Sequence, residues 1–478
     1  MSLPTSWHGD WSNLKAVVLG LGKSGFSTLD TLVELGVEAV AVGATADERL
    51  IDLAEVIGSR FIASESPEVL DDLGYAPDFA VVSPGIAPNH SLVMELEERN
   101  IKLLTDIDLA YRLRDKTEKV ATWIVVTGTN GKTTTCELTA AMLSFDGLRA
   151  VTCGNIGNPI LDAIRDPEGY DFLVVELSSF QLHYLGEISP LASAFLNLAE
   201  DHLDWHGDMH SYFAAKSKIY QGTQIAIVFN EQDPKTLEAA QQADVVEGCR
   251  AIAFSLFTPQ KSAVGYVDDI LVDRAFLENR AEQALEVATE AELSQIGPVS
   301  DQLRANVAAA TALARAASVP PQSIRRALSG FRLSPHRNHP VAEVSGVLYV
   351  NDSKATNAHA ADSSLSAYDS VVWIVGGLFK GVDPTELIKK HGKRLRAAVL
   401  IGSETEQLAK LFSELLPKAA ISVISGDSVM RDAVMAAREL AEPGDTVLLA
   451  PAAASMDQFR DYADRGESFE RAVRELGS

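Results

Sequence analysis

The chain has 478 residues, 46% hydrophobic and 22% charged, which predicts a globular protein of about three domains. Its formal net charge of −25 disfavours a nucleic-acid partner, because such a field repels polyanions at long range. No apolar run is long enough to span a bilayer, the N-terminus lacks the pattern of a signal peptide, and the three cysteines are scattered. These features indicate a reducing, cytoplasmic compartment.

The first segment predicts a unit of strand, turn and helix over residues 15–35. Residues 15–19 form the strand, 20–25 (GLGKSG) the turn with G-x-G-x-x-G spacing, and 26–35 the helix. An oxidoreductase binding NAD(P) is a possible interpretation of this spacing. The next strand, however, ends at Gly43 rather than at the acidic residue that would hold a ribose, which disfavours that interpretation.

The middle segment opens with IVVTGTNGKTTT at residues 124–135. The full phosphate-loop pattern G-x-x-x-x-G-K-[ST] fails, because its first glycine falls on Val126. A strand feeding a turn and a helix nevertheless points backbone N–H groups at one place, where the helix dipole favours an anion. We predict a shortened phosphate loop, with Lys132 near the β- and γ-phosphates and Thr133 offering its hydroxyl to Mg²⁺. The alternative is a chance Gly-Lys-Thr at a helix start.

Polar residues follow later strands of the same predicted sheet. Glu176 ends the apolar strand FLVVE, and a carboxylate there commonly holds Mg²⁺ beside a phosphate loop. His202 lies in AEDHLDWHG and Lys216 in FAAKSKIY. Taken singly, each is more often a solvated or structural residue than a ligand. Because parallel strands open their carboxyl ends on one edge, we expect the three to converge.

The remainder of the middle segment alternates strands with helices. Residues 264–273 predict a hairpin that turns at Asp268 and Asp269, and the alanine-rich residues 303–317 predict a helix. The class is therefore α/β with a mainly parallel sheet. Charged and proline-flanked stretches mark two boundaries and give the domains 1–118, 119–335 and 336–478.

The third segment places polar side chains after several predicted strands. NDSKATN carries Asp352, Lys354 and Thr356, GGLFKG carries Lys380, and APAAASMDQF carries Ser455. Lysines and hydroxyl groups gathered at strand ends suit a small dicarboxylate. Ordinary loop polarity is the alternative for each motif taken alone.

Taken in order, these motifs resemble those of the Mur ligase family of ATP-dependent amide-bond-forming enzymes. The resemblance covers nearly the whole chain and is carried by TGTNGKT, GNIG, ELSSFQL, AEDHLDWHG, AAKSKIY, PHRN, NDSKATN and SMDQF. NDSKATN with SMDQF most resembles the member that adds D-glutamate to UDP-N-acetylmuramoyl-L-alanine. Another ligase of the family, adding L-alanine or a diamino acid, and a nucleotide-dependent module without catalysis remain alternatives.

The resemblance implies three α/β domains. A Rossmann-like N-terminal domain would bind the UDP-sugar, a central P-loop-type domain with a mostly parallel sheet would bind ATP, and a Rossmann-like C-terminal domain would bind the amino acid. It further implies ATP, two Mg²⁺ ions, a carbamylated Lys216 and an acyl-phosphate intermediate. We expect a cytoplasmic monomer that acts in peptidoglycan precursor synthesis on two small-molecule substrates.

By position, the resemblance also implies roles for individual residues. Lys132, Glu176, His202 and Lys216 would be catalytic, and Thr133, Glu176, His202 and Lys216 (as its carbamate) would hold metal. The implied ATP contacts are Gly128, Thr129, Asn130, Gly131, Lys132, Thr133, Thr134, Asn306, Arg337 and Asp352. The implied substrate contacts are Ser24, Ser83, Pro84, Gly85, Asn155, Lys354, Thr356, Lys380, Ser455 and Tyr462.

The sequence departs from the family pattern at two places. Of the family's G-x-H-N-x-x-N stretch, Asn306 matches, but the His-Asn pair falls on Gln302 and Leu303, so no adenine contact is implied there. Gly43 stands near the position where an Asp usually contacts uracil, so we expect backbone or neighbours such as Thr45 to serve instead.

Overall fold

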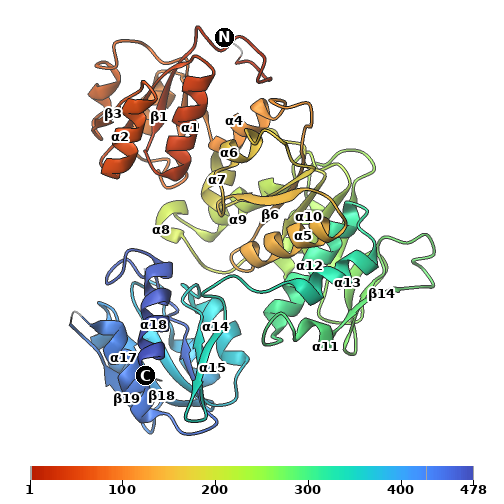
Figure 1. The fold of residues 1–478 in the computed structure, drawn as a ribbon, viewed down its shortest axis with the longest axis vertical. Coiled ribbons are helices and arrows are strands. Elements are labelled where there is room, and N and C mark those ends of the chain that lie inside the picture. The colour runs from red at the N-terminus through yellow and green to blue at the C-terminus, as the bar shows by residue number, and fades with distance from the viewer. Residues whose placement is uncertain (1–2, 380, 427, 477–478) are drawn as a thin grey trace. The chain divides into compact units, whose positions relative to one another are not determined.

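The computed structural model describes residues 3–379, 381–426 and 428–476 (Figure 1). The chain forms three sheets of five, nine and six strands, and parallel pairing dominates each of them. It divides into two compact units. The first comprises Met1–Leu198, Trp205–Ala288 and Asn306–Ala327, and the second comprises Ala199–Asp204, Thr289–Ala305 and Leu328–Ser478. The α/β class predicted from the alternation of strands and helices is confirmed.

The first sheet is wholly parallel, with strand order β3-β2-β1-β4-β5. Its strands are β1 (Lys15–Leu19), β2 (Glu38–Gly43), β3 (Phe61–Ala63), β4 (Phe79–Val82) and β5 (Lys102–Leu104). The accompanying helices are α1 (Lys23–Glu34), α2 (Glu48–Val56), α3 (Ser91–Glu98) and α4 (Asp106–Leu113). The central strands are buried on both faces, as their unbroken valine and alanine runs require.

The turn after β1 is shorter than the sequence predicts, because α1 already begins at Lys23. The turn spans residues 20–22, and Gly20, at φ +86°, is its one residue in the left-handed region. Gly25 lies inside the helix, where a Cβ would stand 2.1 Å from the Gly20 carbonyl oxygen. The spacing of the two glycines therefore serves close approach of helix and strand, and not an extended loop.

The second sheet has the order β14-β13-β12-β11-β10-β9-β6-β8-β7. Its strands are β6 (Thr122–Thr127), β7 (Ala150–Gly154), β8 (Phe172–Glu176), β9 (Ala192–Phe195), β10 (Ala226–Asn230), β11 (Arg250–Phe254), β12 (Ala263–Val267), β13 (Ile270–Asp273) and β14 (Leu285–Thr289). β12 and β13 form the predicted hairpin, and Asp268 takes a left-handed φ of +53° at its turn. Strands β6 to β12 are parallel wherever they pair, so their carboxyl ends share one edge.

In the described part of the chain, nine α-helices belong to the same stretch as the second sheet. They are α5 (Lys132–Phe145), α6 (Ile160–Ile164), α7 (Ser179–Tyr184), α8 (Leu203–His206), α9 (Met209–Ser217), α10 (Pro234–Gln241), α11 (Glu290–Leu293), α12 (Asp301–Ala316) and α13 (Pro321–Gly330). Helix α5 packs on β7 and β8. The predicted alanine-rich helix is confirmed as α12, whose run from Val307 to Ala310 is fully buried. Alanines allow this helix to approach its neighbours closely.

Helix α6 joins the first sheet to the second within the first unit, because both α1 and α4 pack against it. Ser27 donates to Asp162 at 2.6 Å, and Arg165 pairs with Asp30 at 2.6 Å. Tyr111 meets Trp123 edge-on, with ring centroids 5.2 Å apart. Apolar packing and ion pairs together fix these two sheets as one body.

Asp106, the first residue of α4, is buried at this joint. Burial raises its pKa to about 6, and the nearby Gln181 side chain and Ile107 N–H oppose the shift only in part. Neither carboxyl oxygen has a hydrogen-bond partner among the described residues. The folded-state pKa exceeds the ordinary value of 3.8, so the folded protein favours the protonated carboxyl of Asp106. The contribution of this proton to the stability of the fold is complete below about pH 4 and is lost as pH rises through 6.

We therefore expect Asp106→Asn to gain stability over the parent as pH rises from 4 to 7, by about 3 kcal/mol in all. Thermal unfolding of both proteins across that range measures the difference. Asp204→Asn, a change at an exposed residue, is the control. A parent–variant difference that stays constant from pH 4 to 7 would contradict the assignment.

The third sheet has the order β15-β16-β20-β17-β18-β19, and only its β15–β16 pair is antiparallel. Its strands are β15 (His339–Val344), β16 (Val347–Asn351), β17 (Val371–Gly376), β18 (Leu395–Ile401), β19 (Ala420–Val423) and β20 (Thr446–Leu449). The helices are α14 (Ala358–Ser366), α15 (Thr385–His391), α16 (Thr405–Leu415), α17 (Val429–Leu440) and α18 (Tyr462–Leu476). Helices α17 and α18 pack side by side (Figure 1).

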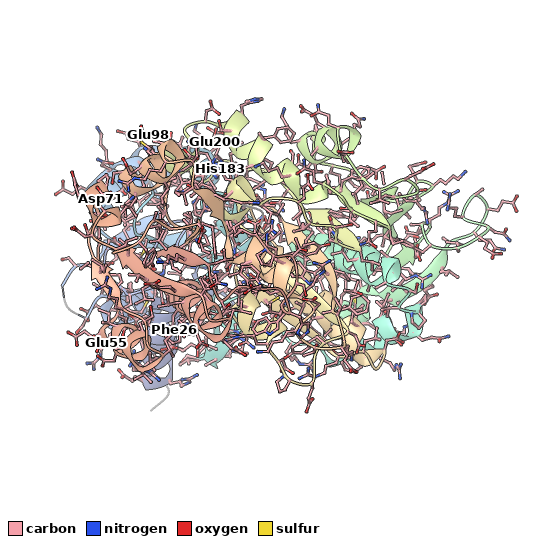
Figure 2. The ribbon with its side chains drawn as sticks, turned by 90° about the horizontal axis from the view of Figure 1, so that it is seen from above. Phe26, Glu55, Asp71, Glu98, His183 and Glu200 are labelled. Carbon is pink, nitrogen blue, oxygen red and sulfur yellow. The ribbon has the colours of Figure 1, made fainter. Side chains whose placement is uncertain are left out.

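The acidic side chains of the first unit lie largely on its surface. Figure 2 shows Glu55, Asp71 and Glu98 at the periphery, and all three are exposed.

Among the described residues, no helix is long and apolar enough to cross a membrane.

Candidate active site

The predicted phosphate loop joins β6 to α5, and its tight turn is made at Gly131, where φ is +82°. Gly128 lies close to Leu196, whose Cβ would be 3.0 Å from any Cβ added there. The Lys132 ammonium folds back and donates to the carbonyl oxygens of Gly128 and Thr129, each at 2.9 Å. Thr133 and Thr134 are buried in the first turn of α5. The loop therefore has the curvature and the cation of a phosphate cradle.

A residue that the sequence analysis missed, Asn197, holds this loop from the adjacent strand end. Its side chain accepts from the Asn130 N–H at 2.8 Å and donates to the Asn130 carbonyl at 3.1 Å. Its own carbonyl accepts from the Thr129 N–H at 3.0 Å. The only signal in the sequence was a polar residue just beyond the end of an apolar strand.

We expect Asn197→Ala to raise the KM for ATP about 30-fold, because two side-chain hydrogen bonds that shape the loop are lost, each worth about 1 kcal/mol. Steady-state kinetics with ATP as the varied substrate measures this effect. The KM for the other substrates should stay within about twofold. An unchanged KM for ATP would show that the loop keeps its shape without Asn197.

Glu176, at the end of β8, is buried and links two other predicted residues. Thr133 donates its hydroxyl to Glu176 Oε2 at 2.7 Å, and Asn155 donates its amide to Glu176 Oε1 at 2.8 Å. Gly154 permits this approach, because a Cβ there would lie 2.5 Å from the Glu176 carbonyl oxygen. The structure thus brings the phosphate loop, the strand-end carboxylate and the GNIG loop together.

Lys216, on α9, is only 2% exposed and reaches the same loop. Its ammonium donates to the Gly128 carbonyl oxygen at 2.8 Å and contacts the Thr127 hydroxyl at 3.4 Å. It also lies 4.9 Å from the ring centre of Tyr212, whose hydroxyl is 3.1 Å from that of Thr129. Tyr212, another residue missed from sequence, lies one turn before Lys216 on the same helix face.

The predicted UDP-sugar contacts lie at the carboxyl edge of the first sheet. Ser24 is in the first turn of α1, and Ser83 follows β4 and donates to the Gly20 carbonyl at 3.3 Å. Pro84 and Gly85 continue this loop, and Tyr184 of α7 donates to the carbonyl of Ile86 just beyond it, at 3.3 Å. The loop is therefore tied to both sheets of the first unit.

Asn306 is buried on α12, also in the first unit. His202 belongs to the second unit, where it takes a left-handed φ of +54° beside Asp201, with its Nε2 3.6 Å from Asp201 Oδ2. Asn357 donates to the same carboxylate oxygen, Asp201 Oδ2, at 3.4 Å. Among the described residues, no group of three or more His, Cys, Asp or Glu is arranged to hold a metal ion.

Asp352 follows β16 in the second unit and is buried. Burial raises its pKa, while hydrogen bonds from Ser364 and from the Asn338 N–H, and the charge of Arg337, lower it. The Asn338 N–H donates to Asp352 Oδ1 at 3.1 Å. Arg337 and Asp352, both predicted to contact ATP, thus act on each other electrostatically.

The loop after Asp352 is organised by the fully buried Arg465 of α18, which the sequence analysis missed. Its guanidinium donates to the hydroxyl and carbonyl oxygens of Ser353, both at 3.0 Å, and to the Ala453 carbonyl at 3.2 Å. Burial lowers its pKa to about 10, partly offset by Asp457. Arg465 therefore ties NDSKATN to the loop that follows β20.

The predicted amino-acid contacts gather around that tie. The Lys354 ammonium lies 3.7 Å from the ring centre of Tyr462, and the Tyr462 carbonyl accepts from the Ser353 hydroxyl at 2.7 Å. Thr356 is half-buried in the same loop, and Ser455 is buried after β20. Lys380 lies outside the described residues.

A glycine turn and a helix start at the carboxyl edge of a parallel sheet, beside a buried strand-end carboxylate, are typical of enzymes that bind a nucleotide through its phosphates. Residues 126–314 match the Mur ligase middle domain, and residues 336–453 match the Mur ligase, glutamate ligase domain. The chain therefore belongs to the Mur ligase family.

Individual relatives agree with this assignment. The chain is 51% identical to the UDP-N-acetylmuramoylalanine–D-glutamate ligase of Leifsonia xyli subsp. xyli, covering 98% of this chain and 94% of that protein. It is 44% identical to the ligase of the same name from Tropheryma whipplei, covering 99% and 98%. A solved UDP-N-acetylmuramate–alanine ligase from Thermotoga maritima shares the fold at 15% identity, with a TM-score of 0.59 over 97% of this chain and all (100%) of that one.

Proposed function

We propose that this protein is an ATP-dependent ligase that joins D-glutamate to UDP-N-acetylmuramoyl-L-alanine, in the cytoplasmic synthesis of peptidoglycan precursors. One observation carries the proposal: Glu176 accepts from Thr133 on one oxygen and from Asn155 on the other. A single carboxylate thus connects the loop for the ATP phosphates with the amide proposed to contact the acceptor substrate. The relatives that are 51% and 44% identical carry this activity in their names.

The reaction must first activate a carboxylate, which is a poor acyl donor because oxide would have to leave. Transfer of the γ-phosphoryl group of ATP gives an acyl phosphate, from which phosphate leaves readily. Two anions must meet for this step, and Lys132 supplies a positive charge where they meet. The backbone N–H groups at the start of α5 orient the phosphates. The amine of D-glutamate then attacks, and the tetrahedral intermediate expels phosphate.

The residues present fit the Mg²⁺ ions that the family implies. The Thr133 hydroxyl and the Glu176 carboxylate are hard oxygen donors 2.7 Å apart. They are the residues of the first unit that we propose to hold the metal, which would offset phosphate charge when bound. His202 stays a ligand predicted from the sequence alone. A carbamate on Lys216 is the proposed further ligand, because it replaces an ammonium with oxygen donors.

We also propose the roles of the three domains. Residues 1–118 would bind the UDP-sugar through Ser24 and Ser83–Gly85, and residues 119–335 would bind ATP. Residues 336–478 would bind D-glutamate through Thr356, Lys380 and Ser455. Support comes from the position of the described members of each group at the carboxyl ends of strands, where α/β ligand sites gather.

The test is phosphate release from ATP with UDP-N-acetylmuramoyl-L-alanine as acceptor. We expect release with D-glutamate and none above background with L-glutamate, L-alanine or a diamino acid. Release with one of the other amino acids would identify a different ligase of the family. ATP binding without release under any condition would indicate a non-catalytic module.

For the amino-acid site, we expect Lys380→Ala to raise the KM for D-glutamate at least tenfold, because a cation facing a carboxylate is lost. The KM for ATP should change less than twofold. The change Lys389→Ala at an exposed residue is a charge-matched control, since Lys389 forms an ion pair with Glu386 on its own helix. An equal rise in both KM values would refute the assignment.

A further inference from the structure

Arginines from three separate segments surround a cavity of about 410 Å³ in the first unit. Arg250 begins β11, Arg280 lies in the loop that follows β13, and Arg315 is in the last turn of α12. Phe276 and Leu277 supply an apolar wall, and Glu278 is the one acidic residue of the lining. Three guanidinium groups around one cavity are unusual in a chain whose net charge is −25.

The guanidinium groups of Arg250 and Arg280 repel each other electrostatically. Burial lowers the pKa of Arg250, and the positive charge of Arg280 lowers it further, while Asp273 acts in the opposite direction. Asp273 is fully buried, but it already pairs with Arg315 at 2.8 Å. In the described part of the chain, the Arg280 side chain makes no hydrogen bond or ion pair. The cluster thus sets three guanidinium groups against two carboxylates, Asp273 and Glu278, which leaves an excess of positive charge.

The loop that carries Arg280 is nevertheless held firmly. Asp273 Oδ1 accepts from the N–H groups of Ala275 and Phe276 at 2.7 and 3.0 Å. Arg315 donates to the Phe276 carbonyl at 2.9 Å. Arg274 donates to the carbonyls of Arg280 and Ala281 at 3.1 and 2.9 Å. These hydrogen bonds fix the backbone at Arg280 before a ligand binds, which lowers the entropy cost of binding.

The cavity is separate from the phosphate loop. Arg250 is the first residue of a strand in the parallel part of the sheet, and the phosphate loop follows the last residue of β6. The two sites therefore lie at opposite edges of the sheet, with β9 and β10 between their strands. Along α12, Arg315 is about 14 Å from Asn306, at 1.5 Å per residue.

We propose that this cavity binds an organic phosphate, at a second anion site that is independent of the ligase reaction. Guanidinium groups match phosphate oxygens with paired N–H donors, and they are weakly hydrated for cations. Phe276 and Leu277 would contact the apolar part of the ligand. The Arg250 guanidinium lies over the Phe276 ring, with its central carbon 5.2 Å from the ring centre. The volume is within the range of small-molecule pockets.

The probes are pyrophosphate, inorganic phosphate and phenyl phosphate, titrated calorimetrically into the full chain carrying Lys132→Ala, which weakens the competing phosphate loop. We expect pyrophosphate to bind, and phenyl phosphate to bind more tightly than inorganic phosphate. Adding Arg280→Ala should weaken pyrophosphate at least tenfold, and adding Glu278→Gln should strengthen it. Arg325→Ala removes the same charge from α13, outside the cavity lining, and should leave the affinity unchanged.

Stability without ligand separates a binding role from a structural one. Because Arg280 repels Arg250, Arg280→Ala should leave the Tm unchanged or raise it in phosphate-free buffer. A fall in Tm of several degrees would overturn the proposal, since it would make Arg280 a structural residue. Absence of binding by all the probes, or equal pyrophosphate affinity with and without Arg280, would overturn it as well.

Discussion

Lys132→Ala should lower the rate of amino-acid-dependent phosphate release on the order of 10³-fold, a loss typical of a group that stabilises transition-state charge. Lys132 is the cation of the phosphate loop, and in the structure its ammonium contacts two carbonyl oxygens of that loop. We expect it to exchange these contacts for phosphate oxygens when ATP binds. The loss should therefore fall mainly on kcat, since the phosphoryl group gains most from the cation during transfer.

The same contacts give Lys132 a second effect, on the shape of the loop, and the experiment must separate the two. Thermal unfolding without nucleotide reports the structural effect, and we expect a change of only a few degrees, because Asn197 still holds the loop. The KM for UDP-N-acetylmuramoyl-L-alanine should stay within about threefold. Lys261→Ala, which removes an exposed lysine from the same unit, should be fully active. Phosphate release within about tenfold of the parent would show that Lys132 is not the transfer-site cation.

Lys216→Ala should be nearly inactive, and short carboxylates such as formate or acetate should restore part of the activity. The expectation rests on burial, because the Lys216 side chain is only 2% exposed, contacts the phosphate loop and lies beside the Tyr212 ring. Removing this side chain leaves an enclosed space that a small anion can enter. A carbamate provides oxygen donors, which an ammonium does not, and the added carboxylate replaces them.

Rescue distinguishes a carbamate from an ordinary lysine. If Lys216 acted as an ammonium, a primary amine should restore activity and a carboxylate should not. The parent should also lose activity in carbon-dioxide-depleted buffer and regain it with bicarbonate, whereas Lys216→Ala should respond to neither. Full activity in Lys216→Ala, or rescue by amines alone, would rule out the carbamate.

Much of the candidate site was predictable because its residues follow strands. Once β6 and β8 are assigned as parallel neighbours, Thr133 and Glu176 must meet at one edge, although 43 positions separate them. The start of α1 was wrong by three residues, because the pattern does not reveal that the turn ends at Gly22 and that Gly25 already lies in the helix. The proposed roles of the residues that gather at these edges stay predictions.

Other contributors could not be predicted, because nothing local distinguishes them. Arg465 lies in an amphipathic helix like any surface arginine, yet it is buried against Ser353, 112 positions away. Asn197 is an ordinary polar residue after a strand until its pairing with Asn130 is known. Arg250, Arg280 and Arg315 come from a strand, a loop and a helix, so no motif contains them.

By itself, the sequence determined the α/β class, the strand, glycine turn and helix of residues 122–145, and the hairpin at Asp268, because each depends on the periodicity and turn residues of one short segment. Only the tertiary structure decided which side chains support the loops and where positive charge collects in an acidic protein. Those outcomes depend on burial and on distances between segments far apart in the chain. The residue pattern of a short segment specifies neither burial nor these distances.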